Sequence, residues 1–293
     1  MDGEYRATPE QLVERMVHLL DIEEIDTDLY RGDRAIHPNM QGRVFGGQVI
    51  AQALVSATRS VEEGRVAHSL HAYFMRAGDP AHPILYQVTR DYDGRSFATR
   101  RVVALQRGKP ILNLAASFHV PEDGIAHQTA MPEVPPPEEL LPEVDYWTKH
   151  GDGLRPGMKE IMTRRWPVEF RMVHPAKPGP TLPRLHGWFR AAAPLADDPA
   201  LHRAVLAFAS DMILLHTSTL PHGGIWMTQP IQTASLDHAL WLHEDFRADK
   251  WLLYATDSPW AGHARGFNRG QIFARDGRLV ASVAQEGLMR THK

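Results

Sequence analysis

Residues 44–61, VFGGQVIAQALVSATRSV, open on a pair of glycines and continue with residues that favour helix. They predict a helix that starts at the glycines. The next four segments are rich in β-branched and aromatic residues and predict strands: HSLHAYFMR, PILYQVTRDYDG, SFATRRVVALQRG and PILNLAASFHV. QRGK, between the last two, predicts a hairpin turn. Upstream, Thr8, Pro9 and Gln11 have the spacing of a capping box and predict a short helix.

The second half of the chain shows the same order of predicted elements. A helix is predicted in DDPALHRAVLAFASDMILLHTS, with strands in VEFRMV and LHGWFRAAA before it and in QTASLDHALWLH after it. One shift along the chain pairs Gly94 with Gly262, and a second shift pairs Ser56 with Ser210 in the two helices. Such matches indicate an internal duplication.

The segment between the halves, residues 121–156, is rich in proline and acidic residues and includes PPP at 135–137. Proline fixes φ and removes a backbone donor, so this composition predicts a linker rather than core. We expect an N-terminal module at 1–122, a linker at 123–160 and a C-terminal module at 161–293.

The composition excludes several classes of protein. A net charge of −3 over 293 residues argues against nucleic-acid binding, for which a basic stripe is typical. The absence of cysteine excludes disulfides, thiolate nucleophiles and cysteine-based metal sites. The first residues do not resemble a signal peptide, and no apolar run approaches the roughly 18 residues of a membrane span. We expect a cytoplasmic protein with no nucleic-acid partner and no membrane insertion.

One charged residue interrupts the apolar face of the second predicted helix. It is Asp211, in FASDMILL at 208–215. An unpaired buried charge is costly, so this carboxylate needs hydrogen-bond partners or a chemical role. The duplication places Ala57 opposite Asp211 and Ser117 opposite Gln285. A core that needed a polar group would need it in both halves, so an Asp present in only one of the two helices argues against a purely structural role for Asp211.

Two further features allow a functional and a structural interpretation. The glycine pair at 46–47 is either a tight entry into the helix or a set of free N–H groups that bind an anion or a developing oxyanion. Histidines separated by three or five residues do not share a strand face, so no metal site is expected from the two pairs available: His68 with His71, and His238 with His243.

Six segments in the same order resemble the acyl-CoA thioesterase II family, the TesB-like double hotdog proteins: VFGGQVIAQAL, HSLHAYFMRAGD, DGRSFATRRVVALQRGKPIL, ASDMILL, SLDHALWLH and ARGFNRGQIFARDGRLVASVAQEGLMR. The resemblance spans nearly the whole chain and is weakest over the predicted linker. It implies an α+β double hotdog, two tandem modules that each pack a long helix on an antiparallel sheet.

The resemblance also implies the catalytic residues. Matched position by position, Asp211, Ser235 and Gln285 hold the hydrolytic water, and Ser is one of the two residue types that the family accepts at position 235. With Ala57 and Ser117 at the corresponding places, the N-terminal module would be degenerate. Each chain would then carry one catalytic set.

Substrate contacts are expected nearby. The N–H groups of Gly47 and Gln48 are the candidate oxyanion donors, and His68 is the histidine to consider if one takes part. Three arginines either meet the ligand phosphates or belong to a solvated strand face: Arg95, Arg100 and Arg101. No cofactor is expected.

The predicted activity is hydrolysis of a fatty acyl-CoA to free fatty acid and CoA, by a protein that forms a homodimer or tetramer. Two alternatives stay open. One is a hotdog-fold hydratase, which adds water to an enoyl-CoA and leaves the thioester intact. The other is a non-catalytic acyl-CoA-binding module.

Overall fold

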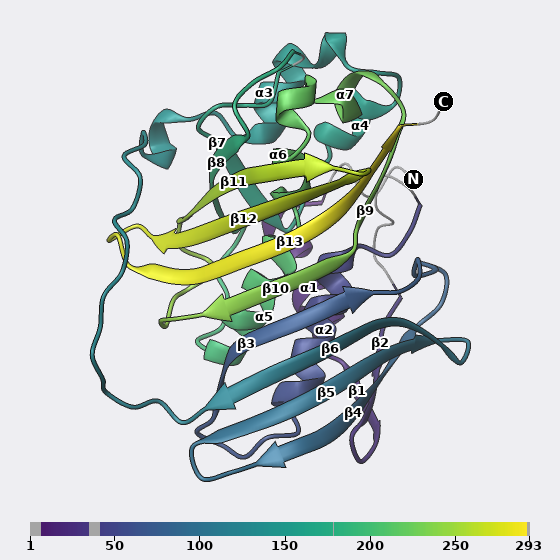
Figure 1. Ribbon diagram of the computed structural model, residues 1–293, viewed down its shortest axis with the longest axis vertical. Coiled ribbons are helices and arrows are strands. Elements are labelled where there is room, and N and C mark those ends of the chain that lie inside the picture. The colour runs from purple at the N-terminus through teal and green to yellow at the C-terminus, as the bar shows by residue number, and fades with distance from the viewer. Residues whose placement is uncertain (1–6, 35–41, 178, 292–293) are drawn as a thin grey trace.

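The structure, a computed structural model, describes residues 7–34, 42–177 and 179–291. One antiparallel sheet curves around two long helices that lie side by side behind it (Figure 1). Its strand order is β1-β2-β4-β5-β6-β3-β10-β13-β12-β11-β8-β7, and β9 pairs with β13. The two halves of the chain join where β3 pairs with β10, with Leu70 opposite Leu240.

The elements of the first half are α1 (Pro9–Leu20), β1 (Glu23–Asp26), β2 (Leu29–Gly32), α2 (Gly46–Thr58), β3 (Val66–Phe74), β4 (Ile84–Asp93), β5 (Phe97–Gln106) and β6 (Lys109–His119). The connection contains η1 (Pro137–Glu139), α3 (Glu143–His150), η2 (Gly151–Gly153) and α4 (Met158–Met162). The second half contains β7 (Val168–Met172), β8 (Arg184–Ala191), α5 (Pro199–Ser210), α6 (Leu214–Thr217), η3 (Leu220–His222), α7 (Ile225–Thr228), β9 (Ile231–Ser235), β10 (Asp237–Leu242), β11 (Leu252–Gly262), β12 (Arg265–Ala274) and β13 (Leu279–Thr291).

The local signals in the sequence are confirmed. Helix α2 begins at Gly46, and the Thr8–Gln11 capping box closes the start of α1. The hairpin between β5 and β6 turns through Arg107 and Gly108, both at positive φ, which is the backbone of the turn that suits the twist of two strands. Helices α2 and α5 are buried on nearly all sides, as expected of core helices.

The second core helix is shorter than the sequence predicts. It ends at Ser210, Asp211 caps it, and the chain turns before α6 starts at Leu214. Aspartate is poorly suited to a helix interior because its side chain competes for backbone hydrogen bonds. The break therefore places Asp211 at the end of α5 rather than on its face.

The strand predicted in QTASLDHALWLH is also divided. Leu236 separates β9 from β10, and both parts pair with β13 on either side of this point. The carboxylate of Asp237 accepts a hydrogen bond from the N–H of Glu286 at 2.6 Å, which ties the division to the neighbouring strand. Ser235 is therefore the last residue of β9, close to the break.

The segment predicted as a linker also contributes buried side chains. Trp147 of α3 and Met158 of α4 pack against Trp226 and Met227 in a separate apolar cluster. The proline-rich part that precedes them runs along one side of the molecule in Figure 1 and connects β6 to these helices. Proline excluded regular strands here but did not prevent tertiary packing.

The stretch Pro199–His222, which contains α5, is long and apolar enough to cross a membrane, since an 18-residue window within it has a mean hydropathy of 1.3. The sequence analysis counted uninterrupted apolar residues, and it did not register this stretch because Arg203 and Asp211 interrupt it. However, 78% of this apolar window is buried inside the fold, which is the behaviour of a core helix.

The start of α2 meets the end of α5 at the glycine pair. A Cβ at Gly46 would lie 2.6 Å from Oδ2 of Asp211, and a Cβ at Gly47 would collide with the backbone carbonyl of Phe208. Any larger residue would force the two helices apart. The structural interpretation of the glycine pair, a tight entry into the helix, is therefore confirmed.

We expect Gly47→Ala to destabilise the fold by about 1–3 kcal/mol, because the added methyl group meets backbone that cannot move aside cheaply. In an ordinary helix the same change is favourable, so the sign of the effect is diagnostic. Urea unfolding measures it. Gly124→Ala, where an added Cβ meets nothing within 4 Å, is the control. Equal stability of the two variants would contradict the close-approach argument.

Candidate active site

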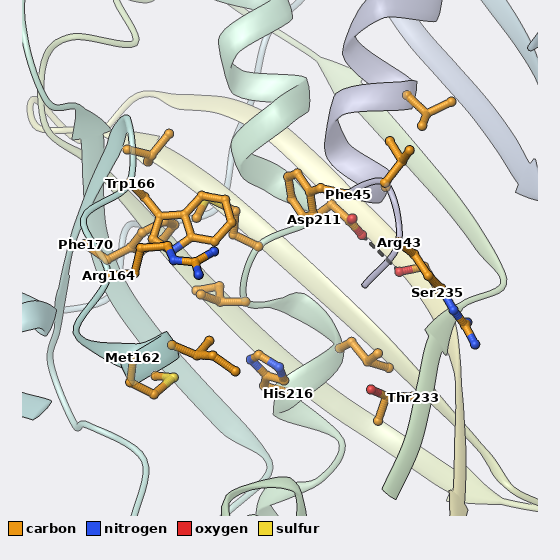
Figure 2. Close-up of a pocket in the computed structure, with 18 of the residues that line it drawn as sticks. Arg43, Phe45, Met162, Arg164, Trp166, Phe170, Asp211, His216, Thr233 and Ser235 are labelled. Atoms are coloured by element: carbon orange, nitrogen blue, oxygen red, sulfur yellow. Dashed lines mark hydrogen bonds between the residues drawn. The ribbon is translucent and has the colours of Figure 1, made fainter. Parts of the chain in front are cut away.

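A cavity of about 730 Å³ lies where the two halves meet. Its walls come from the start of α2, the turn after α5, strand β9 and the segment around α4 and β7, and they include Phe45, Gly46, Met162, Trp166, Phe170, Asp211, Ile213, His216 and Ser235. In Figure 2, Trp166 and Phe170 lie on one side of this space, Ser235 lies on the other, and Phe45 and Asp211 lie between them. Most of the wall is apolar, as is typical of a ligand site, but charged side chains also line it, among them Arg43, Arg164 and Glu169.

The carboxylate of Asp211 is held by three donors. Gln285 Nε2 lies 2.6 Å from Oδ1, and Ser235 Oγ donates to the same oxygen at 3.1 Å, as the dashed line in Figure 2 marks. The backbone N–H of Gly47 donates to the carboxylate from the start of α2. The structure thus brings together the three residues predicted to form the catalytic set.

Burial raises the pKa of Asp211 from 3.8 to about 6, although the hydrogen bonds from Gln285, Ser235 and Gly47 lower it. The side chain is only 9% exposed, so water stabilises its charge poorly. A carboxylate with this pKa is ionised at pH 7 and is a stronger base than an ordinary aspartate.

Gln285 lies on the buried side of Asp211 and not in the cavity. It is 1% exposed, and it is absent from the cavity lining formed by the described residues. Asp211 and Ser235 do line it. Gln285 therefore touches the carboxylate and not a molecule bound in the cavity.

The two expected oxyanion donors have other partners. The Gly47 N–H is directed to Asp211, and the Gln48 N–H lies 3.2 Å from the carbonyl of Phe45. The side chain of Gln48 is buried and lies against Gln52. These bonds do not leave either N–H directed at a substrate.

His68 lies in the first half, apart from the described lining of the cavity. Its Nε2 lies 2.8 Å from Oγ of Ser117, and its ring contacts Phe97 and His119. Burial, with a smaller effect from His119, lowers the pKa of His68. The structure does not bring His68 to Asp211.

The arginines on β5 also have structural partners. Arg100 is 1% exposed and pairs with Asp93 at 2.6 Å, while it donates to Ser60. Arg101 is exposed and pairs with Asp91 at 3.1 Å. Arg100 thus fits neither of the two interpretations given above, because it is a buried ion-pair partner.

Two histidines near the site were missed by the sequence reasoning. His216 of α6 lines the cavity and stacks on Trp226 with ring centroids 4.4 Å apart, and burial lowers its pKa to about 4. His238 of β10 is fully buried and contacts Gln285. It was considered only as a metal ligand, because strand periodicity cannot show which residue it faces.

Comparisons with known proteins match this architecture along the chain. The family model described as acyl-CoA thioesterase matches residues 158–288, and the acyl-CoA thioesterase N-terminal domain matches 36–119. A solved protein with a hot dog fold from Alicyclobacillus acidocaldarius superposes with a TM-score of 0.77 over 95% of this chain and 99% of that one, at 18% identity. The chain is therefore an α+β double hotdog protein, as expected.

Nearer relatives define the family. The chain is 42% identical to acyl-coenzyme A thioesterase 8 of Rattus norvegicus, over 93% of this chain and 88% of the relative. It is 40% identical to the acyl-CoA thioesterase II TesB2 of Mycobacterium marinum, with a TM-score of 0.78 over 95% and 99% of the two chains. The chain belongs to the acyl-CoA thioesterase family.

We expect Asp211→Asn to stabilise the fold at pH 7.5. Because the folded-state pKa of about 6 lies above the ordinary 3.8, the folded protein binds a proton more tightly than the unfolded chain. Protonated Asp211 therefore contributes to the free energy of unfolding below pH 4, and this contribution is lost as the pH rises through 6. It amounts to at most ~3 kcal/mol. Urea unfolding should show a gain of ~1–3 kcal/mol at pH 7.5 that shrinks towards pH 4.

The matched control is Asp257→Asn, which changes a half-exposed carboxylate that pairs with Arg269. This variant should show no gain at pH 7.5. A loss of stability for Asp211→Asn at pH 7.5 would show that its hydrogen bonds outweigh its desolvation.

Proposed function

We propose that this chain hydrolyses fatty acyl-CoA with a water molecule that Asp211 deprotonates. Hydrolysis of acyl-CoA is the activity that its family carries. The observation that supports the role of Asp211 is a buried carboxylate, held by Ser235 and Gln285, at the wall of a mainly apolar cavity.

The chemistry of a thioester suits a site with one base. Water attacks the carbonyl carbon as Asp211 takes its proton, and the C–S bond then breaks as CoA leaves. A thiol has a pKa near 8.5, so the sulfur departs as thiolate and needs no strong general acid. The proton on Asp211 then returns to the products or to solvent. Direct attack by Asp211, which would give a mixed anhydride, is the alternative route.

Each polar residue has a separate part in this scheme. Ser235 lines the cavity and has its hydroxyl on Asp211 Oδ1, so it positions the carboxylate at the point where water arrives. Gln285 holds the same oxygen from the buried side. Both side-chain donors lie on Oδ1, and the Gly47 N–H also donates to the carboxylate. We assign Oδ2, which accepts from neither side chain, as the base.

The acyl chain is proposed to occupy the aromatic side of the cavity. Phe45 and Trp166 lie 6.3 Å apart, and Phe208 packs on Phe45 at 5.0 Å. Aliphatic carbons gain about 25 cal/mol for each Å² of surface that they bury against such walls. The polar side, with Ser235 and Asp211, then receives the thioester.

One catalytic set per chain is proposed, because Ala57 and Ser117 occupy the corresponding places in the first half. Three further expectations remain predictions: the module boundaries at 122 and 160, a cytoplasmic location and a homo-oligomeric state.

Asp211→Asn should reduce thiol release from acyl-CoA by at least ~100-fold, the effect typical of a lost general base. Asn keeps the size of the side chain but removes its basicity. The measurement is release of CoA thiol from short to long acyl-CoAs, with Asp257→Asn as the control that keeps full activity. An unchanged rate for Asp211→Asn would overturn the assigned base.

The same assay separates the alternative functions. Loss of enoyl absorbance without thiol release would indicate a hydratase. Binding of acyl-CoA without either reaction, by folded wild-type protein, would indicate a binding module.

The pH dependence of kcat/KM should show an acid limb near pH 6. Below this pH Asp211 is protonated and cannot accept a proton, so the rate should fall about tenfold per pH unit. Stopped thiol assays between pH 4.5 and 8 measure the limb. An acid limb near pH 4 would be that of an ordinary exposed carboxylate and would argue against Asp211.

A further inference from the structure

A chain of buried hydrogen bonds continues beyond Gln285. Its Nε2 contacts Asp211 Oδ1 at 2.6 Å and also Nδ1 of His238 at 3.1 Å. The other ring nitrogen of His238, Nε2, lies 2.9 Å from Oγ of Ser210, and that hydroxyl donates to the carbonyl of Ala207 at 2.9 Å. His238 is fully buried and Gln285 is 1% exposed, so bulk solvent does not reach these bonds.

The partners fix where each proton lies. An amide nitrogen carries two hydrogens, so Gln285 Nε2 can donate to Asp211 and to His238 at the same time. Nδ1 of His238 must then accept, and its proton lies on Nε2, which donates to Ser210. The Ser210 hydroxyl donates its hydrogen bond to the carbonyl of Ala207. This assignment follows from the network, and every donor in it has an acceptor.

We propose that His238 is a positioning residue of the thioesterase site, which locks the Gln285 amide in the orientation that donates to Asp211. The proposal rests on the catalytic set given above. His238 does not touch the substrate and acts only through Gln285.

The lock is needed because shape alone does not orient an amide. The oxygen and nitrogen ends of Gln285 are nearly the same size, and Oε1 has no hydrogen-bond partner among the described residues. A flip would direct Oε1 at the carboxylate, so that two acceptors would face each other. Asp211 opposes this flip while it is ionised. Once Asp211 has taken a proton from water, it no longer disfavours the flipped amide as strongly, and His238 still holds the amide in place.

The surroundings keep His238 in the state that the lock requires. Burial lowers its pKa to about 3, so Nδ1 remains an acceptor over the pH range in which Asp211 titrates. Among the described residues, His216 from α6 and Arg43 before α2 share the cavity with Asp211, as do charged side chains of the segment around α4 and β7, and Tyr254 from β11 interacts with it electrostatically. Tyr254 is buried and donates to the carbonyl of Ser210.

The first half provides an internal comparison. There His68 makes the same kind of bond to the strand β6, but its partner is the hydroxyl of Ser117 at 2.8 Å. A hydroxyl rotates freely between donating and accepting, so it has no orientation to lock. Position 57 in that half holds alanine instead of a carboxylate. Only the second half has an amide between the histidine and an acid.

The test compares His238→Leu with His238→Asn, two side chains of similar size and shape. Asn presents an acceptor at the place of Nδ1, whereas Leu does not. We expect His238→Leu to lower kcat about tenfold and to leave KM unchanged. It should also raise the acid limb of kcat/KM by about one pH unit, because a flipped amide no longer lowers the pKa of Asp211. Asn should restore the wild-type limb and most of kcat.

The control is His243→Leu. His243 also contacts β13, through Oγ of Ser282 at 2.9 Å, but it is exposed and lies beyond the end of β10. Its pH profile should match that of the wild type. A general loss of packing would lower kcat for both His238 variants alike and leave the acid limb in place, and that result would overturn the proposal.

Wild-type protein gives an independent test if His238→Leu does not fold. Nitrogen-15 NMR of the histidine rings distinguishes the two neutral tautomers. We expect His238 to remain neutral with its proton on Nε2 from pH 5 to pH 8, and a proton on Nδ1 would overturn the lock. A wrong assignment of Asp211 as the base would give a different result: Asp211→Asn would keep its activity, regardless of the effect of the His238 substitutions.

Discussion

The contact on which the site depends is the approach of the α2 start to the α5 end. Gly46 and Gly47 carry no side chain there, so the backbone of α2 reaches the carbonyl of Phe208 and the carboxylate of Asp211. The cavity opens beside this contact, and the sheet joins the halves through β3 and β10 nearby. A bulkier residue at either glycine would move the base relative to the strands that hold Ser235 and Gln285.

This contact also sets the electrostatics of the base. Asp211 follows the last residue of α5, where the helix dipole disfavours a negative charge. The start of α2 lies against it and supplies the Gly47 N–H, where the dipole favours such a charge. With Gln285 and Ser235 added, the carboxylate keeps a pKa near 6 despite burial. The glycine pair is thus an anion-binding helix start, but its anion is the protein's own aspartate.

The sequence predicts those features that depend on local signals. The capping box at Thr8, the start of α2 and the turn at Arg107–Gly108 need only neighbouring residues. The end of α5 at Ser210 and the division at Leu236 depend on partners that are distant in sequence, so periodicity missed them. Family resemblance identified Asp211, Ser235 and Gln285 as a group. It did not indicate that Gln285 stands behind the carboxylate or that His238 orients it.

The duplication explains why one site needs both halves. Each half supplies a buried helix and a histidine that bonds to a neighbouring strand, but only the second adds the acid and the amide. The first half has alanine and serine at the corresponding positions, yet it provides Gly47, which holds the base, and Phe45, which lines the cavity. Those contributions come from the start of α2, so the first half supplies part of the site although it has alanine at position 57. If each chain carries one catalytic set, as proposed, the first half contributes backbone and cavity wall to that site rather than reactive side chains.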